Sequence, residues 1–120
     1  MGKKPSQSNR AGGTEHRFWL KATAEHLKKQ GWEVTEEAPV GNGQTIDILA
    51  VKDGGKTAFE IESGKSDIKA SIEKVHSAGL SNFYIVATSA KVKQNITEKT
   101  ANSPRIKILT PDELFDKSKT

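Results

Sequence analysis

Residues 45–62 read TIDILAVKDGGKTAFEIE, and this stretch decides the fold. Two runs of strand-favouring residues, 45–51 and 56–62, lie on either side of an Asp-Gly pair at 53–54. An Asp-Gly pair between two such runs is a strong signal for a tight β-hairpin. The sequence therefore predicts an antiparallel hairpin at the centre of the chain.

Three acidic residues interrupt the apolar pattern of this hairpin: Asp47 in the first strand, and Glu60 and Glu62 in the second. Because side chains alternate along a strand, Glu60 and Glu62 share one face. A turn at 53–54 sets Asp47 opposite Glu60, whereas a turn at 54–55 sets it opposite Glu62. In either register we expect three carboxylates to gather on one face of the hairpin.

Such a cluster of carboxylates needs a positive partner. Like charges that face each other destabilise a strand pair, and adjacent carboxylates either raise a pKa or bind a cation. Mg²⁺ accepts carboxylate oxygens and keeps several waters for a phosphate ligand, which points to metal-assisted hydrolysis of a phosphodiester. The alternative is a solvated sheet face, on which the acids pair with Lys52, Lys56 and Lys65.

The elements expected around the hairpin follow from apolar spacing and from Gly, Pro and capping residues. Before the hairpin they are a helix over 14–30, a short strand over 32–35 and a loop over 38–44; after it, a helix over 66–78, strands over 82–88 and 106–109, and helices over 90–99 and from 111. A hairpin followed by a βαβ crossover predicts an α/β fold, with a mixed sheet and helices on both of its faces.

The helix expected over 14–30 is apolar on two sides. Its apolar residues form two groups: Phe18, Trp19 and Ala22, beside Glu15, and on the other side Leu20, Ala24 and Leu27. A helix of this kind is covered on both sides, by its own sheet and by a partner subunit. We therefore expect a homodimer.

Length and composition describe one domain. The chain has 120 residues, no cysteine and a net charge of +4, with a basic, polar arm expected to be disordered over 1–13 and the domain over 14–120. Cysteine-based metal sites and nucleophiles are excluded. The sequence has neither a membrane-length apolar run nor a secretory signal, so we expect a cytoplasmic protein without a membrane partner. The positive balance suits DNA as a partner.

The acidic residues also lie where a known family has its own. The chain resembles the PD-(D/E)xK nuclease superfamily, which has a restriction-endonuclease-like fold, in Glu15 on the first helix, Asp47 after a Gly-rich loop and Glu60-Ile61-Glu62 on the next strand. The stretches around these residues look like small nuclease modules of mobile elements, and their layout is similar to that of Holliday-junction resolvases. The resemblance covers roughly residues 12–115 and implies that fold.

The resemblance also implies roles for individual residues. Asp47 and Glu60 would bind Mg²⁺ or Mn²⁺, with the Ile61 carbonyl as a further ligand, and Glu15 would act on the ion through water. The third motif position is usually Lys, but here it is Glu62. Glu62 would therefore position or deprotonate the attacking water.

Because Glu62 stands at the position of the usual Lys, the resemblance implies that another residue supplies the positive charge at the phosphate. Lys65 would stabilise the negative charge that develops on the phosphate. Candidate DNA contacts are Lys65, Ser66 and Lys69 at the start of the helix over 66–78, and Arg17 and Lys21 near Glu15.

The sequence thus predicts a divalent-metal-dependent DNA endonuclease with no organic cofactor. One alternative is a catalytically degenerate module of the same fold that binds DNA or assembles a larger DNA-processing complex. Another is a domain that only binds proteins.

Overall fold

The hairpin forms the middle of a five-stranded sheet. In this computed structural model, which describes residues 13–41, 43–64, 67–100 and 106–117, β2 (Gln44–Lys52) pairs antiparallel with β3 (Gly55–Glu62). Lys52 lies opposite Gly55, and Asp53 and Gly54 both have positive φ angles, 53° and 81°. A two-residue type I′ turn requires positive φ at both of its central positions. The turn at 53–54 is therefore confirmed.

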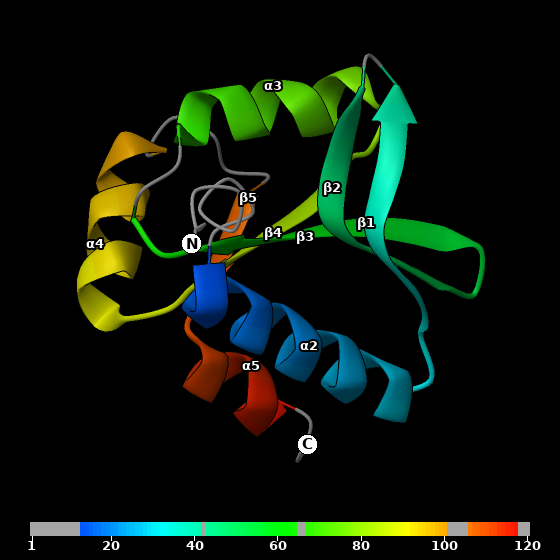
Figure 1. Ribbon diagram of the computed structural model, residues 1–120, viewed down its shortest axis with the longest axis horizontal. Coiled ribbons are helices and arrows are strands. Elements are labelled where there is room, and N and C mark those ends of the chain that lie inside the picture. The colour runs from blue at the N-terminus through cyan, green and yellow to red at the C-terminus, as the bar shows by residue number, and fades with distance from the viewer. Residues whose placement is uncertain (1–12, 42, 65–66, 101–105, 118–120) are drawn as a thin grey trace, which may run out of the picture.

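The remaining elements complete a mixed α/β fold (Figure 1). They are α2 (Gly13–Lys29), β1 (Glu33–Gly41), α3 (Ile68–Ser77), β4 (Asn82–Ala87), α4 (Ala90–Lys99), β5 (Ile106–Leu109) and α5 (Pro111–Lys117). The strands lie side by side in chain order, with β1, β2 and β3 antiparallel and β3, β4 and β5 parallel. The predicted α/β class and mixed sheet are confirmed.

The first strand is longer than the sequence indicated. The loop predicted over 38–44 is wrong, because β1 continues to Gly41 and Pro39 pairs with Thr45. Pro39 and Gly41 favoured a loop, but β1 lies at the edge of the sheet, where a residue without an N–H group is tolerated. A register shift lies between Pro39 and Gly41, and after it Gly41 pairs with Gln44. The arm predicted over 1–13 lies outside the described residues, except for Gly13, where α2 begins.

Helices cover both faces of the sheet (Figure 1), and each face has its own core. The core under α2 and α5 comprises Leu20, Ala24, Leu27, Ile48, Ala50, Phe59, Ile61, Val86 and Leu114. The core under α3 and α4 comprises Ile46, Ala58, Ile68, Val75, Phe83, Ile85, Ala87 and Ile96. Ile46 and Ile48 belong to different cores although they are two residues apart, so strand β2 departs from simple alternation at Asp47.

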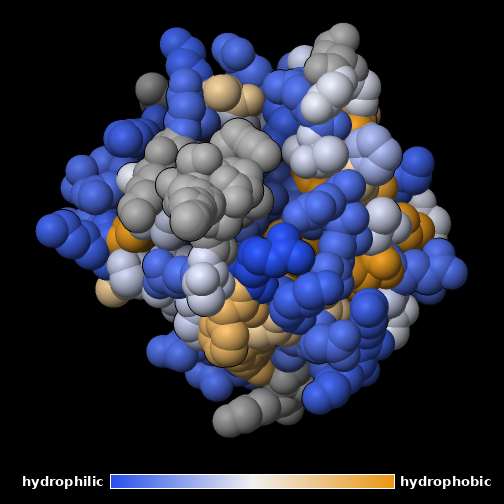
Figure 2. All heavy atoms as spheres, viewed as in Figure 1, coloured by the Kyte–Doolittle hydropathy of each residue, from blue (hydrophilic) through white to orange (hydrophobic). Residues whose placement is uncertain are grey.

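Helix α2 covers the sheet with one of its two apolar sides, and from the other side only Trp19 packs against the same core. Leu20, Ala24 and Leu27 are buried, whereas Phe18 on the other side is 60% exposed. The face viewed in Figure 2 is largely hydrophilic, with a hydrophobic patch below its centre, where Figure 1 places α2. The homodimer stays a prediction. None of the described helices has both the length and the apolar composition of a membrane span.

Candidate functional site: a carboxylate pair at the end of the hairpin

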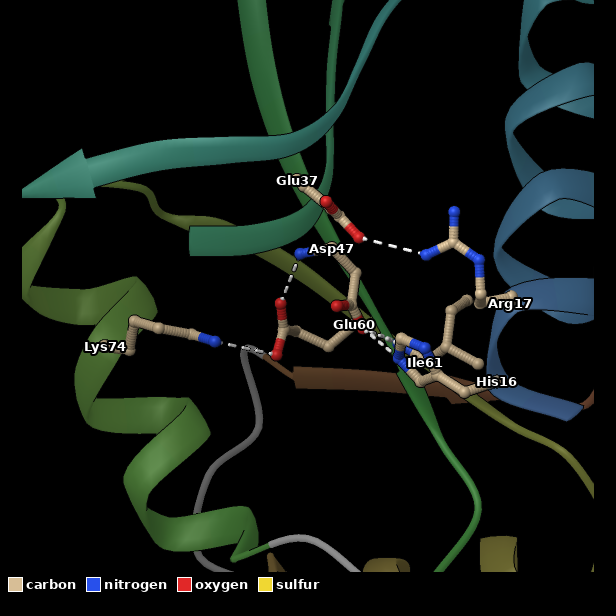
Figure 3. A network of polar contacts seen from close by, with 7 residues as sticks. All are labelled: His16, Arg17, Glu37, Asp47, Glu60, Ile61 and Lys74. Carbon is tan, nitrogen blue, oxygen red and sulfur yellow. Dashed lines mark hydrogen bonds and ion pairs between the residues drawn. The ribbon is translucent and has the colours of Figure 1, made fainter. Parts of the chain in front are cut away.

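The backbone ladder of the hairpin stops where the acidic residues begin. Its pairs run from Lys52–Gly55 to Ile48–Phe59. One residue further on, the backbone N–H of Asp47 donates to Glu60 Oε2 and that of Ile61 donates to Asp47 Oδ2, each at 2.8 Å (Figure 3). Each carboxylate thus binds an amide of the opposite strand, and Asp47 and Glu60 are held together as a pair.

A helix from each face of the sheet supplies a basic side chain to this carboxylate pair. His16 Nε2 of α2 lies 3.1 Å from Asp47 Oδ2, and Lys74 Nζ of α3 lies 3.1 Å from Glu60 Oε1. Figure 3 shows His16 and Lys74 on opposite sides of the pair. The carboxylates therefore lie between the two helical layers, and each has a basic side chain within hydrogen-bonding distance.

The electrostatics of the pair show that its negative charge is only partly offset. Burial, followed by the charge of Asp47, raises the pKa of Glu60 to about 7, although Lys74 and the Asp47 amide act in the opposite direction. The hydrogen bond to Asp47 raises the pKa of His16 against the effect of burial, and the charges of Glu60 and Glu62 add to the rise. The site therefore favours additional positive charge.

The structure brings together the residues predicted to bind metal. Asp47, Glu60 and Ile61 are in direct contact, and the side chain of Glu62 is buried one alternation further along β3. Glu15 is exposed, and the residue that reaches Asp47 from α2 is His16. Within the described part of the chain, no group of three or more His, Cys, Asp or Glu side chains is arranged to hold a metal ion.

The candidate DNA contacts are distributed over two helices. Arg17 and Lys21 of α2 form ion pairs with Glu37 and Glu36 of β1, at 3.6 and 2.8 Å, so a phosphate would have to compete with these carboxylates. Lys69 is exposed on α3. The remaining two candidates, Lys65 and Ser66, lie outside the described residues.

Sequence reasoning missed two residues of the site, His16 and Lys74. A signal existed for His16, because the spacing 16, 20, 23 and 27 places it on the same helical stripe as Leu20 and Leu27. Its Nδ1 is buried and has no hydrogen-bond partner among the described residues. Lys74 follows no pattern that distinguishes it from the other lysines, since only the packing of α3 on the sheet brings it to Glu60.

Fold and site together define an α/β protein with a five-stranded mixed sheet and a carboxylate pair at the end of its central hairpin. Among solved structures, the crystal structure of AF1548, a protein of unknown function, is similar, with a TM-score of 0.60 at 17% sequence identity. The similarity covers 85% of this chain and 66% of that one, just under two thirds of its length. At this identity the likeness shows the fold alone. No family model and no curated protein matches the chain.

Proposed function

We propose that the chain is a cytoplasmic, divalent-metal-dependent DNA endonuclease whose site is the Asp47–Glu60 carboxylate pair. The observation that carries the proposal is the placement of two carboxylates side by side between the helical layers, where the Asp47 amide donates to Glu60 Oε2 and the Ile61 amide to Asp47 Oδ2, each at 2.8 Å. Burial and the charge of Asp47 raise the pKa of Glu60 to about 7 despite its contact with Lys74, and a buried group perturbed in this way is a candidate for a functional site. The restriction-endonuclease-like resemblance in the sequence points to the same residues.

The donor set suits a hard cation. Asp47 and Glu60 offer carboxylate oxygens, and the Ile61 carbonyl is the predicted further ligand. Mg²⁺ is commonly held by one or two carboxylates together with waters and substrate phosphate, so it does not need a cage of protein ligands. Lys74 and His16 hold oxygens of the pair, and the cation would replace the contact of Lys74 with Glu60 Oε1 while His16 keeps its contact with Asp47 Oδ2.

When bound, a divalent cation would activate water and neutralise charge at the phosphate. The residues of the chain would do the rest. Lys74, once released from Glu60, would hold a phosphate oxygen, a role that the sequence had assigned to Lys65. Glu62 would position the attacking water and accept its proton, and His16 would hold Asp47 in place through Oδ2. Exposed Lys69 would contact the DNA backbone from α3.

Cleavage of supercoiled plasmid and of a four-way junction, with Mg²⁺ or Mn²⁺, tests this proposal. We expect metal-dependent cutting by the wild type and loss of at least about 100-fold in Asp47→Ala, since one transition-state contact is worth that much. Glu98→Ala removes an exposed carboxylate of α4 and serves as the matched control, with wild-type cutting expected. Equal cutting by Asp47→Ala and Glu98→Ala would contradict the proposal.

A second candidate is the catalytically degenerate module that binds DNA or assembles a larger complex. It is favoured by the contacts of Lys74 and His16, which already give each carboxylate a positive partner. Salt-dependent DNA binding without cleavage in either metal would support this candidate. Neither binding nor cleavage would leave a domain that binds only proteins.

A further inference from the structure

A second site candidate lies on the face of the sheet that α2 and α5 cover. It is a cleft of about 760 Å³, lined by the last turns of α2, the first halves of β3 and β4, and parts of β5 and α5. The carboxylate pair, in contrast, uses the first turn of α2 and the second half of β3. The volume is within the range of ligand-binding pockets, about 300–1,000 Å³. We call this feature the aromatic cleft.

The aromatic cleft concentrates the aromatic residues of the chain. Of seven Phe, Trp and Tyr residues in the sequence, three have rings in contact with one another in it, Trp32, Phe59 and Tyr84, whereas Phe83, which also lines it, belongs to the core under α3 and α4. Phe59 and Tyr84 are stacked, with centroids 5.0 Å apart and planes inclined by 14°, and Trp32 meets Phe59 edge-on at 6.4 Å. These contacts connect three rings from different elements into one wall. Tyr84 is only partly buried, so its ring remains accessible to a ligand.

The charged side chain that lines the aromatic cleft is that of Lys107 on β5. The other polar groups are the imidazole of His26, whose pKa is lowered by burial and by Lys29, and the amides of Gln30 and Asn82. Among the described lining residues there is no Asp or Glu. Lys52 lies beside it, with Nζ 5.6 Å from the Trp32 ring centroid and 2.9 Å from the Gln30 carbonyl oxygen. An exposed lysine with no carboxylate among the described lining residues favours an anionic ligand.

We infer that the aromatic cleft binds a nucleotide, with the base against Tyr84 and Trp32 and the phosphate toward Lys107. Bases stack on aromatic side chains whatever their sequence, and a nearby cation holds the phosphate. The amides of Gln30 and Asn82 would hydrogen-bond the edge of the base. The same chemistry is offered by a free mononucleotide and by an unpaired nucleotide of a strand. This inference does not depend on the proposed cleavage at Asp47.

An NMR titration of the ¹⁵N-labelled full chain with adenosine 5′-monophosphate tests the inference. We expect saturable shifts of the Trp32 indole N–H and of the Asn82 and Tyr84 amides, with little change at the amides of Asp47 and Ile61. No saturable shift, or shifts confined to Asp47 and Ile61, would overturn it. Asp47→Ala should bind as the wild type does, so loss of cleavage and loss of nucleotide binding are separate results.

Two substitutions, with a third as control, separate the contribution of the lysine from that of the aromatic ring. Lys107→Gln should weaken binding about tenfold, the loss expected for one hydrogen bond to a charged group. Tyr84→Leu should do the same by removing the stacking ring, whereas Lys99→Gln, at an exposed site on α4, should bind as the wild type does.

Inorganic phosphate that shifts these signals as strongly as the nucleotide would overturn the role of the ring. A phosphorylated single strand and a blunt duplex are the remaining probes. Tighter binding of the strand than of the mononucleotide would assign the cleft to unpaired DNA, and the reverse to a free nucleotide.

Discussion

The Lys74–Glu60 and Lys93–Glu113 ion pairs show opposite electrostatic behaviour. Lys93 Nζ lies 2.7 Å from Glu113 Oε1 in a partly exposed pair, and hydrogen bonds from Lys93 and the Thr110 amide lower the pKa of Glu113. Lys74 Nζ lies 3.1 Å from Glu60 Oε1 in a largely buried pair, yet the pKa of Glu60 is raised to about 7. A lysine partner is therefore not enough to offset the surroundings of Glu60.

The difference comes from what surrounds each carboxylate. Glu113 is exposed to water, and hydrogen bonds from Lys93 and the Thr110 amide favour its ionised form. Glu60 loses hydration and lies beside Asp47, and these two effects outweigh Lys74. The Lys93–Glu113 pair at the surface joins α4 to α5. The buried Lys74–Glu60 pair leaves unbalanced negative charge, which a cationic ligand would neutralise.

Replacing the lysine of each pair should give the largest difference in stability between the two ion pairs. At pH 8 we expect Lys74→Met to lower the free energy of unfolding by about 3 kcal/mol or more, because it leaves a buried carboxylate without its partner. Lys93→Met should cost less than about 1 kcal/mol, as is usual for exposed pairs. Urea denaturation of both variants measures the difference.

A double substitution identifies the source of the Lys74→Met effect. Adding Glu60→Gln removes the buried negative charge and should restore most of the lost stability. If Lys74→Met costs no more than Lys93→Met, or if Glu60→Gln brings no recovery, the contrast between the two pairs is not electrostatic.

The pH dependence of stability should distinguish the two carboxylates by its sign. The folded-state pKa of Glu60, about 7, exceeds its ordinary value of 4.5, so the folded chain binds this proton more tightly than the unfolded chain. Its contribution to the free energy of unfolding therefore decreases by about 3 kcal/mol as pH rises from 4.5 through 7. Glu113, with its lowered pKa, contributes stability that is lost as pH falls.

The comparison of wild type with Glu60→Gln between pH 4 and 8 isolates this contribution. His16, whose pKa is also raised, adds a loss of stability of the same sign as pH rises above 6.5, but both proteins contain it. The stability of wild type relative to Glu60→Gln should fall across the interval. A relative stability that is flat or rises with pH would contradict the account of Glu60.

The smallest expected effect concerns the caps of the two helices that carry the lysines. The Asp67 side chain accepts from the Ala70 amide at the start of α3, and the Ser89 side chain accepts from the Val92 amide at the start of α4. Asp67→Ala and Ser89→Ala should each cost about 1 kcal/mol. Only Asp67→Ala should also raise the pKa of Glu60, because it loosens the helix that holds Lys74. NMR titration of the Glu60 carboxyl in both variants checks this, and equal pKa values would show that α3 positions Lys74 without its cap.

Short stretches of sequence predicted most of the fold, because turns and helix ends depend on residues that are close together in the chain. The Asp53-Gly54 pair predicted the turn that the structure shows, and the helices expected over 14–30 and 66–78 match the bounds of α2 and α3 within one or two residues. Strand β1 was predicted too short, because a proline indicates a loop unless the strand lies at the edge of a sheet. Whether a strand lies at the edge depends on the whole sheet and not on its own residues.

The candidate site was predictable in part for the same reason. One hairpin joins Asp47 to both Glu60 and Glu62, so the sequence placed the three on one hairpin, and the turn at 53–54 that the structure shows selects Glu60 as the partner of Asp47. His16 and Lys74 lie 31 and 14 residues from their partners in the chain, and tertiary packing alone brings them there. The resemblance to a nuclease implied instead that Glu15, the neighbour of His16, acts on the ion through water, and that Lys65, near the start of the helix that carries Lys74, acts on the phosphate.

Paramagnetic broadening by Mn²⁺ in the NMR spectrum tests most directly the claim that the Asp47–Glu60 pair binds a divalent cation. At substoichiometric Mn²⁺ we expect the amides of Asp47, Glu60 and Ile61 to broaden first, and this effect to disappear in Asp47→Ala and persist in Glu98→Ala. Broadening confined to exposed acidic residues elsewhere, or the same pattern in wild type and Asp47→Ala, would contradict the claim.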